Sequence, residues 1–425
     1  MAIQRSRREV LAGGGTAVLG ATAGCLDAIP GLGGDDDEDD GLDRTLKLGV
    51  LAPLSGENQQ IGEAIEKAVQ LPADQLDEAR EEGDWDVSLE YDIEIKDTES
   101  SSTVAVQAAK ELTDAGYPAV AGAGASNTTL QAAQQVLIPF RVACCSPAAT
   151  TPTMSVLNDI GLVYRTITSD ALQADVLAEK AADEEGHASA ATLYENTASG
   201  LQLSRAFAQA FQGGYGGTIT DQVAFERGVD SYADQVATIR EEGPELVVVI
   251  GPADDGPQLF NELLEGGDEA IYVTDSMRDS SLHDQVDHSI DGIRGTSMHF
   301  EAQGELYFED RFNHTYDEEP GPFAAQAYDA AAVLLLANAY AGQNDGMAIG
   351  AAVGAVTDAT GEEIMPTNLQ RGFELAAQGE PIEFHGASNE IRFDENGDVT
   401  DAWFDFWEFD SEHRDGVQRL DRVSL

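Results

Sequence analysis

Basic residues are scarce in this chain of 425 residues, which has 23 lysines and arginines against 78 aspartates and glutamates. The formal charge of −55 excludes nucleic acid and anionic lipid as partners, because a strongly acidic surface repels both. Such a chain also repels itself in dilute buffer, whereas at about 1 M salt the Debye length falls to about 3 Å. With 42% hydrophobic residues, the composition indicates a folded protein adapted to molar salt, and not a disordered acidic one.

Cysteines are also scarce, with three in the chain, at positions 25, 144 and 145. Cys144 and Cys145 are neighbours in a strand-like run, where successive side chains point to opposite faces, so a disulfide between them would be strained. We interpret both as small buried hydrophobic residues and predict no disulfide framework. Long apolar runs are missing too, since no segment after Cys25 approaches the roughly 18 residues of a membrane-spanning helix.

Two motifs of export and processing stand in the first part of the chain. Ser6–Leu11 looks like a twin-arginine export motif. Thr22–Cys25 follows an uncharged stretch too short to span a bilayer, and it resembles a lipobox, whose cysteine takes a diacylglyceryl group. We therefore expect a signal peptide over residues 1–24, a lipidated Cys25, and an acidic linker over 25–44. These features predict a protein that is exported and lipid-anchored on the outer face of the cytoplasmic membrane.

Strand and helix patterns alternate after the linker. Apolar runs predict strands over Leu46–Ala52, Tyr91–Lys96, Ala119–Ala123, Ile138–Cys145, Ala188–Tyr194, Gln222–Phe225, Leu246–Ile250 and Ala270–Thr274. Helical spacing predicts helices over Ile61–Ala79, Thr103–Ala115, Thr128–Gln135, Ala171–Glu185, Leu201–Phe211, Tyr232–Glu241, Pro257–Leu264, Ala324–Tyr340 and Met365–Ala377. The alternation implies two successive α/β units with parallel sheets. Near the end, Glu390–Phe393 and Ala402–Phe409 are predicted to form a hairpin around the turn Asp394–Asp398.

The order and spacing of four short motifs resemble those of the Leu/Ile/Val-binding family, the substrate-binding proteins of branched-chain amino acid ABC transporters. The motifs are Leu51–Gly56 with Gly62, Ser146–Thr150, Ala327–Ala330 and the turn Phe393–Asp398. The resemblance implies an α/β fold of the periplasmic binding protein type I, in which two Rossmann-like lobes with parallel sheets are joined by three crossover strands.

The same resemblance implies the division of the chain and its partners. Lobe 1 would comprise residues 45–167 plus 298–389, and lobe 2 residues 168–297 plus 390–425. The ligand would lie in the cleft between the lobes, and the closed form would be presented to ABC permease subunits in the membrane. We expect a monomer without a cofactor.

A zwitterionic amino acid in a dry cleft needs N–H or O–H donors for its carboxylate and acceptors for its ammonium group. Ser126 and Asn127 lie where a predicted strand leads into a helix, which directs backbone N–H groups at an anion. The turn after Ser146 offers the Thr150 hydroxyl as a donor and the Ala148 carbonyl as an acceptor. The alternative is that Ser126 and Thr150 only cap their helices.

The resemblance also implies contacts from the second lobe. Asp275 directly follows a predicted strand and matches the position where the family often has a carboxylate for the ammonium group. The family commonly holds the ligand side chain with aromatic residues, at positions that here read Ile61, Ser199 and Ala253. Phe323 alone is aromatic and suitably placed. The pocket is therefore expected to be wider or more polar than one for leucine, and the ligand to be another amino acid, an amide or a small carboxylate.

Motifs of catalysis and metal binding are weak or missing. Gly122–Asn127 begins like a dinucleotide-binding turn, but Asn127 stands at the third glycine position. Asp394–Asp398 starts like a calcium loop, but Val399 stands where that loop needs glycine. The seven histidines lack the spacing of a zinc site, and we find no nucleophile elbow or phosphate loop. We expect no metal and no enzymatic activity. A ligand-sensing ectodomain and a secreted α/β enzyme remain as alternatives.

Overall fold

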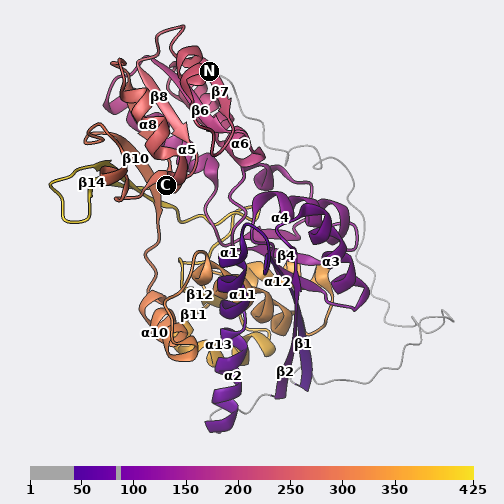
Figure 1. The fold of residues 1–425 in the computed structure, drawn as a ribbon. Coiled ribbons are helices and arrows are strands. Elements are labelled where there is room, and N and C mark those ends of the chain that lie inside the picture. Colours follow the sequence, from indigo (N-terminus) through magenta and orange to yellow (C-terminus); the bar gives the residue numbers. More distant parts are fainter. Residues whose placement is uncertain (1–42, 83–87) are drawn as a thin grey trace, which may run out of the picture. The chain divides into compact units, whose positions relative to one another are not determined.

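Residues 43–82 and 88–425 are described by a computed structural model, shown in Figure 1. The export motif, the lipobox with Cys25 and most of the acidic linker lie outside these residues. Among the helices of the described residues, none combines the length and the hydropathy that crossing a bilayer requires.

The first sheet is entirely parallel and has the order β2-β1-β3-β4-β5. Its strands are β1 (Asp43–Ala52), β2 (Ser88–Asp97), β3 (Ala119–Gly122), β4 (Ala143–Ser146) and β5 (Val163–Arg165). The helices of this lobe are α1 (Gln59–Ala68), α2 (Leu71–Glu82), α3 (Ser102–Asp114), α4 (Ser126–Ala132), α10 (Glu305–Tyr316), α11 (Ala324–Ala341), α12 (Gly346–Val356) and α13 (Leu369–Ala377). A small parallel pair, β11 (Glu362–Ile364) and β12 (Ile382–Phe384), lies beside them.

Helix α11 is the central helix of this lobe. It packs against β1, β3 and β4 on one side and against α1, α12 and α13 on others. This is why its sequence is alanine- and leucine-rich on every face, since a helix surrounded by protein has no polar side. In Figure 1, α11 lies beside α12 and near β4.

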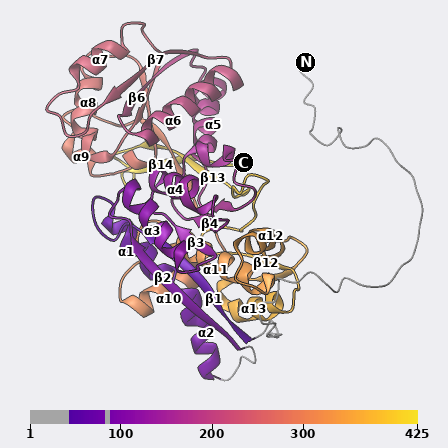
Figure 2. The same ribbon diagram turned by 90° about the vertical axis from the view of Figure 1, so that its right-hand side faces the viewer.

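The second sheet has seven strands in the order β14-β13-β10-β9-β8-β6-β7. They are β6 (Ser189–Glu195), β7 (Thr218–Phe225), β8 (Leu246–Ile250), β9 (Ala270–Val273), β10 (Arg294–His299), β13 (Trp403–Phe409) and β14 (Val417–Ser424). Its helices are α5 (Asp170–Glu179), α6 (Ala198–Gln209), α7 (Ala233–Ile239), α8 (Gly256–Leu264) and α9 (Leu282–Gln285). Figure 2 shows α5 to α8 around β6 and β7. The strands β6 to β10 are parallel, and β13 and β14 are added antiparallel.

The chain passes between the two lobes three times, through residues 166–169, 300–304 and 385–402. Two of these connections are tied to α11. In the first, the Thr166 hydroxyl donates to the carbonyl of Gln326 at 2.7 Å. In the third, the N–H groups of Ala387 and Ser388 and the Ser388 hydroxyl donate to the buried carboxylate of Asp329. The fold therefore has two lobes, as the sequence predicts, and most strands of each sheet are parallel.

Three predictions of local structure are wrong for identifiable reasons. The single helix over Ile61–Ala79 is two helices, because Pro72 lacks an N–H group and its ring clashes with the preceding turn. The strand over Ile138–Cys145 begins only at Ala143. Before it the chain completes helical turns, with Phe140 N–H donating to the Val136 carbonyl at 2.9 Å. A short apolar run does not distinguish a buried helix end from a strand.

The third error concerns the C-terminal hairpin. Strand β13 pairs with β10 and β14, while Phe393 forms only an isolated bridge with Val399. Since β13 is largely buried, it needs a partner strand on each side. The second partner, β14, was not predicted because its residues are mostly exposed and charged, so it forms no apolar run. The turn itself is present, closed by the Asp394 carboxylate, which accepts the N–H groups of Asn396 and Asp398 at 2.8 and 3.0 Å.

Both internal cysteines are buried and unbridged, as predicted. Burial raises the pKa of the Cys144 thiol to about 12. Neither side chain therefore offers a reactive thiolate at neutral pH.

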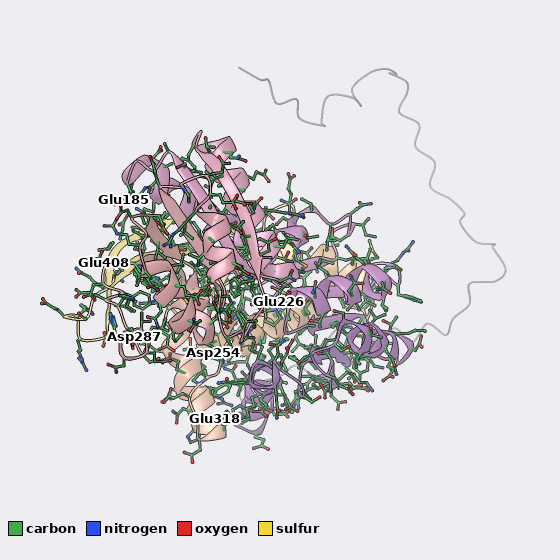
Figure 3. All side chains as sticks on the ribbon, turned by 45° about the horizontal axis from the view of Figure 1, so that its top comes forward. Glu185, Glu226, Asp254, Asp287, Glu318 and Glu408 are labelled. Carbon is green, nitrogen blue, oxygen red and sulfur yellow. The ribbon has the colours of Figure 1, made fainter. Side chains whose placement is uncertain are left out.

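Acidic side chains of both lobes reach the surface. Figure 3 labels Glu185, Glu226, Asp254, Asp287, Glu318 and Glu408, which come from six different places in the chain. The Asp254 side chain keeps 90% of its surface exposed, and its closest cation, Arg227, lies 3.5 Å away. Some of these acids have cationic partners, since Glu185 and Glu408 both contact Arg294 and Glu318 contacts Lys67.

Candidate ligand-binding site

A cavity of about 280 Å³ lies where the carboxyl ends of strands from both sheets meet. In open α/β sheets, ligands bind outside these strand ends. The cavity is lined by fifteen residues: Ala148, Thr150, Asp170, Glu195, Thr197, Ser199, Gly200, Leu203, Ile250, Gly251, Pro252, Thr274, Asp275, Ser276 and Phe323. A larger hollow of about 710 Å³ lies between the segment Pro152–Val156 and helices α5 and α6, away from the strand ends.

Five of the seven predicted ligand-binding residues line this cavity, namely Ala148, Thr150, Ser199, Asp275 and Phe323. Ser126 and Asn127 do not. The Ser126 hydroxyl accepts the N–H group of Thr151 at 3.3 Å and so supports the turn that carries Thr150. Asn127 is exposed and lies in a separate hollow with Ser102 and Gln131.

The capping alternative does not describe Ser126 and Thr150. The N-cap of α4 is Ala125, without a side-chain hydrogen bond, and Ser126 is already inside the helix. Thr151, not Thr150, accepts the N–H group of Thr153 at the start of the short helix Pro152–Val156. Thr150 instead uses its hydroxyl to donate to the Asp170 carboxylate at 3.0 Å.

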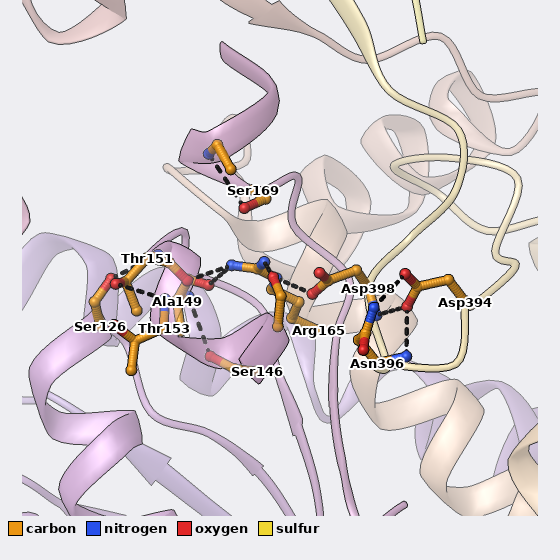
Figure 4. Close-up of polar contacts among 12 residues, drawn as sticks. Ser126, Ser146, Ala149, Thr151, Thr153, Arg165, Ser169, Asp394, Asn396 and Asp398 are labelled. Carbon is orange, nitrogen blue, oxygen red and sulfur yellow. Dashed lines mark hydrogen bonds and ion pairs between the residues drawn. The ribbon is translucent and has the colours of Figure 1, made fainter. Parts of the chain in front are cut away.

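Arg165, the last residue of β5, holds the turn that forms the first wall of the cavity. Its buried guanidinium donates to the carbonyls of Ala149 and Thr151, both at 2.9 Å, and to the Ser155 hydroxyl. Its Nε pairs with the Asp398 carboxylate at 2.6 Å. Figure 4 shows this network reaching from Ser126 on one side to the Asp394 turn on the other. Arg165 therefore positions Thr150 without lining the cavity itself.

Two aspartates give the cavity its charge. Asp170 is the first residue of α5 and is 5% exposed, and its pKa is raised to about 7 by burial and by the negative charge of Asp275. Asp275 is surrounded by protein yet keeps solvent contact through the open cavity. Its loss of hydration also raises its pKa, against the hydrogen bond from Gln173 Nε2 at 3.3 Å.

Glu195, at the end of β6, adds a third carboxylate. Its pKa is raised by burial, and the neighbouring Arg227 partly opposes this shift. The charges of Asp255 and of Glu57, from the first lobe, raise it further. The cavity is thus surrounded by acidic groups.

The sequence analysis missed Asp170, Glu195, Thr197, Thr274 and Ser276. One signal could have found Glu195, because it directly follows the predicted strand Ala188–Tyr194, and the rule of carboxyl strand ends applies to every strand of the sheet. Ile61 and Ala253, two of the three positions compared with aromatic residues, do not line the cavity, whereas Ser199 does.

A possible cation site lies elsewhere, where ligand atoms of Glu383, His385 and Glu390 come close together. The guanidinium of Arg392 contacts both glutamates. Because this side chain already supplies the positive charge that the carboxylates need, we assign no metal there.

Comparison with known proteins agrees with this geometry. The chemotactic signal transduction system substrate-binding protein BasB of Halobacterium salinarum is 25% identical over 307 residues, which are 70% of this chain and 71% of that protein. The leucine-binding protein LivK of Thermotoga maritima has a TM-score of 0.66 and 20% identity, covering 89% of this chain and 98% of that one. A solute-binding protein of Rhodopseudomonas palustris, in complex with 3,4-dihydroxybenzoic acid, has a TM-score of 0.63 and 18% identity over 90% of this chain and 97% of that one.

The two structural likenesses show the fold, which is that of the periplasmic binding proteins of type I. A family model described as periplasmic binding protein matches residues 45–370. With two lobes, a cavity at their strand ends and this match over most of its length, the chain belongs to the periplasmic binding protein family.

Proposed function

We propose that this protein is an extracytoplasmic solute-binding lipoprotein of an ABC importer, which captures an amino acid or a related small polar ligand as its two lobes close. The observation that carries the proposal is the cavity at the carboxyl strand ends, with Thr150 on one wall and Asp275 on the other. A ligand that contacts both walls stabilises the closed state by its differential affinity for that state. The protein would release the ligand unchanged, without turnover.

The moving bodies of the proposal are the two lobes, each built on one of the two sheets. Contacts beside the cavity connect the two bodies: the Thr153 hydroxyl donates to Gln202 Oε1 of α6 at 2.7 Å, and Thr151 donates to the same oxygen. Hinge motion would use the three connections, two of which are held by α11 on the side of the first body.

We further propose export by the twin-arginine route, lipidation at Cys25 and attachment to the outer face of the cytoplasmic membrane, with ABC permease subunits as partners and the protein itself a monomer. The support is the motif sequence Ser6–Leu11 and Thr22–Cys25. The test is metabolic labelling with a fatty acid. Wild type should take up label and stay with the membrane, and Cys25→Ala should do neither.

Adaptation to molar salt belongs to the same proposal. It is supported by the charge of −55 and by the acidic side chains that Figure 3 labels on both lobes. Since screening acts most on exposed charges, the melting temperature should rise as KCl is raised from 0.1 to 2 M.

A thermal-shift screen in 2 M KCl tests ligand capture. Ligands that bind only the native state raise the melting temperature. Small-angle scattering with and without each positive ligand then reports closure as a decrease in radius of gyration. If no amino acid, amide or small carboxylate shifts the melting temperature, the proposal is rejected.

A second candidate function is a ligand-sensing ectodomain that reports to a signalling partner. The observation that favours it is the similarity to a protein named as part of a chemotactic signal transduction system. Deletion of the gene separates the two functions, because loss of uptake with intact taxis indicates an importer, and loss of taxis with intact uptake indicates a sensor. Binding of an amide or small carboxylate remains an alternative for the ligand, tested in the same screen.

A further inference from the structure

The cavity is unbalanced in charge. Its fifteen lining residues include three carboxylates, Asp170, Glu195 and Asp275, and among them is no lysine, arginine or histidine. Arg165, the cation whose charge acts on Asp170, forms its ion pair with Asp398 instead. Arg227, which acts on Glu195, is half exposed and lies nearer Asp254 and Asp255.

Two of the hydroxyl protons near these carboxylates are already used inside the protein. Thr150 donates to Asp170 at 3.0 Å, and Ser276 donates to the carbonyl of Gly251 at 3.0 Å. Thr197 Oγ1 accepts the N–H group of Gly200 at 3.1 Å, and this bond leaves its own proton unused. The cavity therefore offers many acceptors to a ligand and few free donors.

Closure of the lobes would raise the energetic cost of the uncompensated negative charge in the cavity. Asp275 and Ser199 are exposed in the present structure, and a closed cleft would remove them from water. Burying carboxylates without a counter-ion is strongly unfavourable, and a second anion in the same space would add repulsion. A zwitterion leaves the net charge of the cavity unchanged, whereas a ligand of net positive charge neutralises it.

The apolar part of the lining fits an alkyl chain. Leu203, Ile250, Phe323 and Ala148 lie among the polar residues of the same cavity. At about 280 Å³ the cavity is just below the roughly 300–1,000 Å³ range of pockets for drug-sized ligands, so its ligand is small.

We propose that this cavity selects a small aliphatic ligand of net positive charge, a basic amino acid or an amine, whose cationic group is held by Asp170 and Asp275. This inference rests on the proposed function, since it names the ligand class of the same site. It excludes benzoate-like anions and gives neutral amino acids a lower affinity.

Isosteric pairs test the charge alone. Titration calorimetry in 2 M KCl compares L-arginine with L-citrulline and L-lysine with L-2-aminoheptanoic acid, and agmatine is added as an arginine analogue without a carboxylate. We expect each cation to bind at least tenfold more tightly than its neutral isostere. Agmatine binding as tightly as L-arginine identifies an amine site, and binding of L-arginine or L-lysine alone identifies a basic amino acid site.

Two variants and a control connect this preference to the residues. Asp170→Asn and Asp275→Asn keep the shape of the side chain and remove its charge, and each should reduce the preference for the cation to less than threefold. Asp287→Asn removes the carboxylate of an exposed aspartate outside the cavity and should leave the preference unchanged. Circular dichroism and melting temperatures establish that each variant is folded.

The outcomes separate the two proposals. If L-citrulline, L-2-aminoheptanoic acid or benzoate binds as tightly as the cations, the inference on charge is wrong and the solute-binding function stands. If no member of the panel, including leucine and glutamine, gives heat or a thermal shift, both are wrong. Equal loss of preference in Asp287→Asn would also overturn the inference. The preference would then come from the net negative charge of the whole protein and not from the carboxylates of the cavity.

Discussion

The two walls of the cavity are built in opposite ways. On the wall that follows β4, Ala148 is buried, Arg165 binds the carbonyls of Ala149 and Thr151, and Thr150 donates to Asp170. On the wall that follows β6 and β9, Ser199 and Asp275 are exposed to the cavity. The first wall has used its polar groups within the protein, whereas the second presents the Asp275 carboxylate and the Ser199 hydroxyl to the cavity.

This difference separates stability from specificity. A wall whose hydrogen bonds are satisfied internally is rigid and contributes shape and position. A wall that presents carboxylates without a counter-ion contributes charge, and gains a counter-ion only when a ligand arrives. Substitutions behind the first wall should therefore unfold the protein more than they change which ligand binds, and substitutions in the second wall should do the reverse.

The largest effect is expected for Arg165→Met. The change leaves the Asp398 carboxylate and two buried carbonyls without their donor, and breaking a buried ion pair costs about 3–5 kcal/mol. Denaturant unfolding in 2 M KCl measures the loss. Arg371→Met is the control, because this arginine pairs with Glu362 and Glu374 at the surface and should change stability little.

A double variant checks the reason for that loss. Asp398→Asn added to Arg165→Met removes the unpaired charge, and should restore part of the stability. An equal loss in the single and double variants would show that the carbonyl contacts, not the ion pair, hold the wall.

Gly397→Ala should have the next largest effect, because this residue supports the same wall from behind. Its φ is +79°, and an added Cβ would lie 2.1 Å from the carbonyl oxygen of Val163, beside Arg165 in β5. Gly379 has a similar φ of +72° with open space around it, so Gly379→Ala measures the backbone strain alone. We expect about 1–2 kcal/mol for Gly379→Ala and about 3 kcal/mol for Gly397→Ala, measured as free energies of unfolding. Equal values would show that the close approach relaxes.

The sequence predicted much of this architecture for a physical reason. Parallel strands buried on both faces are continuous apolar runs, so β1, β3, β6 and β8 were recognisable without a structure. Strand β14 was not, because an edge strand with exposed charged residues has no apolar pattern. Helix α12 was missed because Gly346 and Gly350 lower helix propensity. They are needed for close packing, since a Cβ on Gly346 would lie 2.0 Å from the Arg141 carbonyl.

The residues of the site were likewise predictable only where a local sequence pattern marks them. Thr150 and Asp275 stand in local motifs next to predicted strands, which made them visible. Arg165 and Asp398 are 233 positions apart, and no local pattern indicates that they meet. Asp170 was hidden by its own position at the start of a helix, where an aspartate is ordinarily read as a favourable charge near the positive end of the dipole.

Asp170→Asn should change stability and cation binding in opposite directions. The pKa of Asp170 is raised from 3.8 to about 7 in the folded protein, by burial and by Asp275. Between these pH values the unfolded chain has lost a proton that the folded protein keeps, so stability falls as pH rises from about 4 to about 7. At pH 8 the asparagine variant should be more stable than wild type, by on the order of 2 kcal/mol, while binding cations less tightly. Denaturant unfolding of wild type and variant at pH 5 and pH 8 measures their free energies of unfolding. Equal stability of the two proteins at pH 8 would contradict the prediction.

The smallest expected effect is the pH dependence of binding, which tests whether the second wall works by charge. The groups that act on Asp170 are Asp275, Arg165 and the Thr150 hydroxyl, and Glu195 lines the same cavity. A cation prefers the ionised carboxylate, so its binding below pH 7 must release the proton of Asp170. The affinity for L-arginine, whose own charge is constant in this range, should therefore rise between pH 5 and 7, by at most about tenfold per unit, and level off above pH 7. Titration calorimetry in two buffers of different ionisation enthalpy counts the released proton directly. In Asp170→Asn the slope should shrink to the part due to Asp275 and Glu195, and an unchanged slope would assign the titration to those two groups alone.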